Sequence, residues 1–222
     1  MEVFLDSSQR MSTSSTTRAS FLLNRDIIRI KSVSVISASF SNLTYNISSI
    51  NNLASFGRMP PKYYTSSEFV ATVNTLLGSA GSIAFDPATN LLTWTLSTPI
   101  QGGMMSDILG LSPLLVYNGS FTSTLSLARP SAVSFVCPSL QSFSCNSHVQ
   151  GIKNGGRSLF TSHVEVGFGQ VQTVRVNIPH IQIVNGASLS LIEMELLDPS
   201  SGRTFDSSEV PQWSLILKLE TE

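Results

Sequence analysis

Four residues stand at the spacing of a phosphate-binding loop: Gly151, Gly156, Arg157 and Ser158. In such a loop, backbone N–H groups between a buried strand and the start of a helix hold the phosphates of a nucleotide. The seven residues before Gly151, SCNSHVQ, lack the apolar character of a buried strand, and the residues after Ser158 alternate as a β-strand does. Arginine also replaces the lysine that contacts the phosphates. We therefore predict a Gly-rich connection between strands and no nucleotide site.

The other residues that perform chemistry are few and scattered. The three histidines lack the spacing of a metal-binding motif, and the two cysteines lack a nucleophile signature. These residues are His148, His163, His180, Cys137 and Cys145. Glu193 and Glu195 share one face of a predicted strand, as a glycosidase dyad would, but they lie in an acidic C-terminal region that favours a solvated strand face. We predict no enzyme, no catalytic, cofactor-binding or metal-binding residues, and no small-molecule substrate.

Charge is sparse and unevenly distributed. Charged residues make up 12% of the sequence, about half the usual fraction. Because charge repulsion between copies is weak on such a surface, the composition favours assembly. Basic residues gather in 1–31 and acidic ones in 193–222, so the basic end is either a solvated arm or a contact with nucleic acid or a neighbouring subunit. No long run of Lys and Arg occurs, which argues against nucleic-acid binding as the main activity.

The uncharged stretch 108–128 is long enough to cross a membrane. Gly110, Pro113, Asn118 and Gly119 interrupt it, together with several hydroxyl side chains. A membrane-spanning helix needs a predominantly apolar run, so no membrane span is predicted.

Apolar and polar residues alternate along most of the chain, as they do in half-buried β-strands. Ile28 and Ile30 alternate with basic residues, and the phase then shifts so that Val33 and Val35 become the apolar positions. A shift of one residue moves the apolar side to the opposite face of a strand. We predict a β-bulge here, or a strand that passes from one sheet to another.

One amphipathic helix is predicted within 65–78. Thr65 and Glu68 form a capping box, and Gly78 ends the helix. Its apolar stripe consists of Phe69, Val70, Val73, Leu76 and Leu77. The stripe covers the open end of a β core, or it is a partner-binding face. A hairpin over 83–96 and a short helical turn over 105–112 follow.

Further strands are predicted from the same alternation, at 43–47, 125–127, 133–137, 164–168, 174–178, 181–183, 189–197 and 213–219. With only two helical pieces, this pattern predicts an all-β protein built as a β-sandwich or barrel. Residues 1–18 are rich in Ser and Thr and show no period, so we predict a flexible N-terminal arm that becomes ordered against a neighbour. Residues 19–222 are predicted to form one domain.

Several segments carry a family resemblance in their order along nearly the whole chain. They are 3–24, 27–52 with Tyr45, Ile47, Asn51 and Asn52, the helix in 64–77, the hairpin IAFDPATNLLTWTL at 83–96, the DILGL turn at 107–111 and LSLIEMELLDPSSGRTFD at 189–206. Together they resemble the penton or minor capsid proteins of virophages, polinton-like viruses and related large DNA viruses.

The resemblance implies a single jelly roll over 19–222, with two antiparallel sheets packed face to face and one or two short helices. It implies a structural capsid protein, with five copies forming a pentamer at each icosahedral vertex of the virion, beside the major capsid protein. Assembly would take place inside the host cell. Another single-jelly-roll minor capsid protein would fit the same segments.

Two other classes of function are open at this stage. A carbohydrate- or receptor-binding sandwich, such as a fibre head or a lectin-like module, would use Trp94, Trp213 or a tyrosine to stack on sugars. Both tryptophans lie within apolar alternation, which favours core packing instead. An enzyme on a β-sandwich would need a site assembled from residues far apart in sequence.

Overall fold

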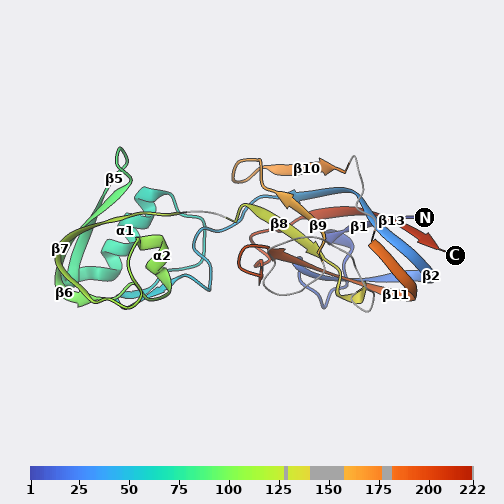
Figure 1. The fold of residues 1–222 in the computed structure, drawn as a ribbon, viewed down its shortest axis with the longest axis horizontal. Helices are drawn as coiled ribbons and strands as arrows, with labels where there is room; N and C mark the ends of the chain where they lie inside the picture. The colour runs from blue at the N-terminus through green and yellow to red at the C-terminus, as the bar shows by residue number, and fades with distance from the viewer. Residues whose placement is uncertain (128–129, 141–157, 177–181, 222) are drawn as a thin grey trace. The chain divides into compact units, whose positions relative to one another are not determined.

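The apolar positions of the sequence form two hydrophobic cores, one in each of the two compact units whose elements Figure 1 draws. The computed structural model describes residues 1–127, 130–140, 158–176 and 182–221. One compact unit comprises Met1–Thr44 and Pro130–Glu222, and the other comprises Tyr45–Arg129. The sequence predicted one domain over 19–222. The structure differs because 45–129 hold enough apolar residues, gathered around one helix, to enclose a core of their own.

The first unit is a set of antiparallel strands. They are β1 (Glu2–Asp6), β2 (Arg18–Ser41), β8 (Ala132–Val136), β9 (Ser158–His163), β10 (Val171–Arg175), β11 (Gln182–Asp198), β12 (Arg203–Thr204) and β13 (Trp213–Thr221), with 3₁₀ turns at Ser7–Gln9 and Pro138–Leu140. The strand order is β1-β13-β2-β11-β8-β9, with β10 paired to β2 and β12 paired to β11.

The long strand β2 belongs to both layers of this unit. Its first part, from Arg18 to Val33, pairs with β11. Its last part, from Ser37 to Ser41, lies between β13 and β10. One layer is therefore β10-β2-β13-β1 and the other is β2-β11-β8-β9, with a shared core that includes Phe40 and Phe135. This is the jelly-roll β-sandwich that the sequence predicted.

The predicted irregularity in β2 is confirmed. Arg29 has a positive φ of 53°, a rare conformation for a residue with a side chain. The pairing of β2 with both β11 and β13 shifts register next to Ile30. Ile30 and Val33 are both fully buried. The bulge therefore keeps apolar residues on the core side before and after the phase change.

The predicted N-terminal arm differs most from the structure. Residues 2–6 form β1, which pairs with β13 at the edge of the sandwich. Leu5 is buried, and Ser7 Oγ accepts a 3.0 Å hydrogen bond from the backbone N–H of Trp213. The indole N–H of Trp213 in turn donates to the backbone oxygen of Thr16, at 2.5 Å. Residues 1–18 are therefore packed on their own chain, because the alternation of Val3 and Leu5 is that of a short edge strand.

Two predicted strands, at 43–47 and 164–168, are not strands in the structure, and neither is the short predicted strand at 125–127. In the first, the polar side chains face inward: Asn42 and Thr44 are fully buried. The Asn42 amide donates to Val166 O at 2.8 Å, and Thr44 donates to the Asn42 side chain at 2.9 Å. These side-chain bonds take the place of a strand ladder. In the second, the strand lies earlier, as β9.

The second unit contains the predicted helix and hairpin. Its elements are β3 (Leu53–Ala54), β4 (Gly57–Arg58), α1 (Ser66–Leu77), β5 (Gly81–Asp86), β6 (Leu91–Ile100), α2 (Ser106–Leu109) and β7 (Tyr117–Thr124), with 3₁₀ turns at Gly78–Ala80 and Gly103–Met105. The capping box of Thr65 and Glu68 and the C-terminal Gly78 are confirmed. Phe69 and Val73 of the apolar stripe are fully buried, so the stripe packs into the core of this unit.

Strands β5, β6 and β7 form a three-stranded antiparallel sheet against α1. Trp94 of β6 is fully buried, stacks on Phe121 at 5.5 Å between ring centroids, and donates its indole N–H to Ser123 Oγ at 2.9 Å. The helical turn predicted over 105–112 is present as α2, which ends at Gly110 with a left-handed φ of 61°. Strand β7 was not predicted from the sequence.

Candidate functional site

The outer face of the layer β10-β2-β13-β1 carries a row of small polar side chains. The register places Thr173, Ser39, Ser214 and Asp6 side by side across the four strands. Ser39 and Thr173 are joined by a hydroxyl–hydroxyl bond of 3.1 Å. Their neighbours along the strands point into the core, so the row faces solvent.

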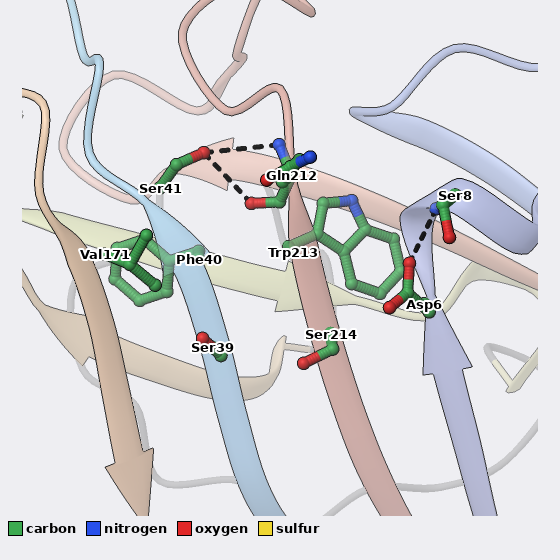
Figure 2. A pocket seen from close by; sticks show the side chains of 9 residues that line it. All are labelled: Asp6, Ser8, Ser39, Phe40, Ser41, Val171, Gln212, Trp213 and Ser214. Atoms are coloured by element: carbon green, nitrogen blue, oxygen red, sulfur yellow. Dashed lines mark hydrogen bonds between the residues drawn. The ribbon is translucent and has the colours of Figure 1, made fainter.

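A shallow pocket of about 270 Å³ lies on this face (Figure 2). Its lining residues are Asp6, Ser8, Ser39, Phe40, Ser41, Val171, Gln212, Trp213 and Ser214. At its rim, Ser41 Oγ donates to Gln212 O at 3.1 Å and accepts from Gln212 N–H at 3.2 Å. This rim is therefore fixed by hydrogen bonds between β2 and the start of β13.

Asp6 is the one charged residue that lines the pocket. It caps the following 3₁₀ turn by accepting a 2.8 Å hydrogen bond from Ser8 N–H. Hydrogen bonds from the side chain and backbone of Ser8 lower the pKa of Asp6 below its ordinary value, so the group is a carboxylate at neutral pH. The pocket thus offers hydroxyls, amide groups and one negative charge, which suit hydrogen bonding to a polar partner surface.

The P-loop-like segment falls mostly outside the described residues, which exclude Gly151, Gly156 and Arg157. Ser158 is the first residue of β9, and its hydroxyl donates to Phe160 O at 3.0 Å. A strand thus begins where a phosphate-binding loop would require a helix. The prediction that a β-strand follows the loop is confirmed.

The scattered histidines and cysteines form no site in the part of the chain that the structure describes. His163 is exposed at the end of β9, and Cys137 is buried, with its Sγ 3.2 Å from Ser139 Oγ. His148, His180 and Cys145 lie outside the described residues. Among those that are described, no group of three or more His, Cys, Asp or Glu side chains has the arrangement to hold a metal ion.

Of the acidic pair on β11, Glu195 has its carboxylate in structural contacts, and Glu193 contributes its backbone N–H. Glu195 forms an ion pair with Arg18 at 2.9 Å and accepts a hydrogen bond from Thr204 Oγ1 at 2.5 Å. The backbone N–H of Glu193 donates to Ser139 Oγ at 3.1 Å. Arg18 is 70% exposed, so this pair sits at the surface of the sheet. The carboxylate of Glu195 holds β2 and β12 to β11.

A buried ion pair, which the sequence analysis missed, stabilises the turn before β13. Arg203 donates to Glu209 through two nitrogens, at 2.5 and 2.9 Å, and their side chains are 10% and 0% exposed. Glu209 also accepts from the backbone N–H of Asp206 at 2.8 Å. Burial opposes the charge of Arg203, but the hydrogen bonds and attraction of Glu209 outweigh it and raise the Arg203 pKa.

Neither tryptophan is positioned to stack on a ligand. Trp213 is 3% exposed, Trp94 is fully buried, and Trp213 makes edge contacts with Phe21 and Phe135. This confirms the expectation of core packing. A sugar-binding site would need other aromatic side chains on the surface.

Large apolar side chains are exposed in both units. In the second unit, the consecutive residues Leu114, Leu115 and Val116 are 87%, 56% and 60% exposed. In the first unit, Leu22 of β2 is 70% exposed, and Phe4 on edge strand β1 and Val171 on β10, at the opposite edges of their layer, are each 62% exposed. These are the residues most suited to contact other molecules. Within the described residues, no helix has the length and apolar character that crossing a membrane requires.

The strand order and the packed core define a class of fold, the single jelly-roll β-sandwich, here with a second unit inserted between β2 and β8. Among solved structures, the crystal structure of the mavirus penton protein is similar to this chain, with a TM-score of 0.50 and 10% sequence identity over 100% of both chains. The fold is therefore penton-like. The sequence matches no protein-family model and no curated protein sequence.

Proposed function

We propose that this protein is a structural capsid subunit that forms a ring of five copies at each icosahedral vertex of a virion, beside the major capsid protein. The observation that carries the proposal is the likeness in fold to a penton protein over the full length of both chains. The low charge of the sequence supports it, because copies with little charge repel one another weakly.

A ring needs a heterologous interface, in which two different patches of the subunit meet. We assign one of these patches to the outer face of β1, at the edge of the sandwich. Phe4 is 62% exposed there, and the register places it opposite Ile216 of β13. Burying a phenylalanine side chain contributes roughly 1.5–3 kcal/mol, which is enough to influence assembly. Residues 1–18 would then contact both their own sheet and a neighbour.

The mass of the purified protein, measured by light scattering across a concentration series, tests the ring. Five chains per particle support the proposal, whereas a stable trimer contradicts it. If the protein is a monomer, purified virions decide: its absence from them contradicts the proposal.

The patch has its own test. Phe4→Asp should weaken ring formation, whereas Ser207→Asp, which places the same charge at an exposed position of the turn before β13 in the same unit, should not. Equal effects of the two substitutions would contradict the assignment of Phe4 to the interface.

A further inference from the structure

The two edges of the sheet β5-β6-β7 differ in how their backbone groups are satisfied. On the β5 edge, the Asn74 side chain of α1 accepts from Ile83 N–H at 2.7 Å and donates to Ile83 O at 3.0 Å. The amide side chain thus occupies the backbone position that another strand would take. This edge is closed by the protein itself, as natural sheets often arrange.

The β7 edge has no such closure along its middle. The backbone N–H and C=O of Ile83 point away from β6. By the alternation of an antiparallel ladder, the backbone groups of its partner Trp94 therefore point toward β7, where they bond to those of Phe121. The backbone groups of Ser120 and Thr122 must then point outward. Within the described residues, no hydrogen bond to either outward amide is present. The end of the strand is covered, since a Cβ on Gly110 would lie 2.5 Å from Thr124 O.

The composition around this edge lacks the usual protection against strand pairing. Exposed edges ordinarily carry lysine, proline or an inward-pointing charge. No charged residue occurs from 108 to 127, and β7 contains no proline. Immediately before it lie the exposed side chains of Leu114, Leu115 and Val116. An open backbone edge therefore continues directly from an exposed apolar segment.

We infer that the β7 edge pairs antiparallel with β7 of a second copy of this chain. Only another strand offers N–H and C=O groups at the spacing of Ser120 and Thr122. A copy of the same strand is suitable, because two uncharged edges meet without repulsion across a two-fold axis. Centred on Phe121, the pairing sets Ser120 of one copy opposite Thr122 of the other. At this register Val116 of one copy falls opposite Ser126 of the other, beyond the end of β7.

This contact is isologous, so it differs from the heterologous contact that closes a ring. It would join two single chains, or one chain from each of two rings. The ring proposed above and the β7 pairing can therefore fail independently, and both are visible in the particle mass.

Thr122→Pro tests the pairing on the full-length protein. Proline removes the outward N–H but leaves the bonds to β6, and an edge strand tolerates it. The matched control is Thr122→Val, which keeps the N–H and a similar shape. In sedimentation equilibrium we expect wild type and Thr122→Val to double in mass as concentration rises. Thr122→Pro should need about tenfold more protein, or more, to reach the same degree of doubling, because both copies lose the Thr122 N–H bond across the pair.

A second measurement covers the case in which proline disrupts the fold. Ser120→Cys combined with Thr122→Cys should form a disulfide between residue 120 of one copy and residue 122 of the other under mild oxidation. Doubling that persists unchanged in a folded Thr122→Pro overturns the inference, as does the absence of that cross-link. Rings of five whose mass does not double with concentration also overturn the β7 pairing, while they support the vertex proposal. In that case the β7 edge would be open to a strand of another protein.

Discussion

Removal of one partner of the buried pair Arg203 and Glu209 should destabilise the sandwich strongly. Glu209→Gln keeps the shape of the side chain but leaves the Arg203 charge without its counterion, where the side chains are 10% and 0% exposed. Breaking a buried pair in this way costs roughly 3–5 kcal/mol. For a chain of this size that corresponds to a loss of about 6–20 °C in melting temperature, at roughly 2–4 °C per kcal/mol.

The assay is urea unfolding followed by tryptophan fluorescence. A Trp94→Phe background makes Trp213 the reporter, so the signal comes from the unit that contains the pair. Lys218→Met is the control: Lys218 and Glu220 form an ion pair at 3.3 Å whose side chains are 51% and 53% exposed, and removing it should leave the unfolding midpoint unchanged.

A double variant separates the charge effect from the packing effect. Arg203→Met with Glu209→Leu removes both charges and should recover most of the stability lost in either single variant. Recovery should be incomplete, because the N–H of Asp206 loses the acceptor it has at 2.8 Å. A loss below about 1 kcal/mol in Glu209→Gln, typical of surface pairs, would refute the reasoning. So would a double variant that costs as much as the two single variants added together.

Two further predictions concern the second unit. Gly110→Ala should destabilise the protein more than Gly119→Ala. Both glycines have a positive φ, but an added Cβ at Gly110 would lie 2.5 Å from Thr124 O, whereas at Gly119 nothing lies within 4 Å. Equal falls in melting temperature for the two variants would contradict this. Hydrogen bonds from Thr65 lower the pKa of Glu68 below its ordinary value of 4.5. The contribution of the Glu68 carboxylate to stability is therefore fully present above pH 4.5 and is lost as the pH falls through the lower pKa of the folded state. Glu68→Gln should therefore flatten the fall of melting temperature below about pH 4.5, and the same slope as wild type would count against the capping role.

Local signals made the helix and the hairpin predictable. The capping box of Thr65 and Glu68 and the stop at Gly78 act within a few residues, so the sequence alone specifies them. The phase change before Val33 was also informative, because a strand that serves two layers must rotate its apolar side.

Other elements depended on contacts that no short window shows. In strand β7, Gly119 and Ser123 stand at the positions that alternate with the exposed polar residues, where a strand usually carries apolar side chains, so the alternation that identifies a strand is missing. At Asn42 and Thr44 the alternation was real, but the polar side was the buried one, because side-chain bonds to loop backbone make that burial possible. The outer face with Ser39 and Ser214 required the register of strands more than 170 positions apart, which composition cannot give.

The pairing of β1 with β13 also determines the order in which the protein can fold during synthesis. Met1 and Leu219 exchange hydrogen bonds in both directions, at 2.7 and 2.8 Å, so this edge of the sandwich closes only after β13 has been made. The unit Tyr45–Arg129 is continuous in sequence and can fold as soon as it leaves the ribosome. Until β13 arrives, the edge of β2 that it will cover is open, and an open strand edge can pair with another chain.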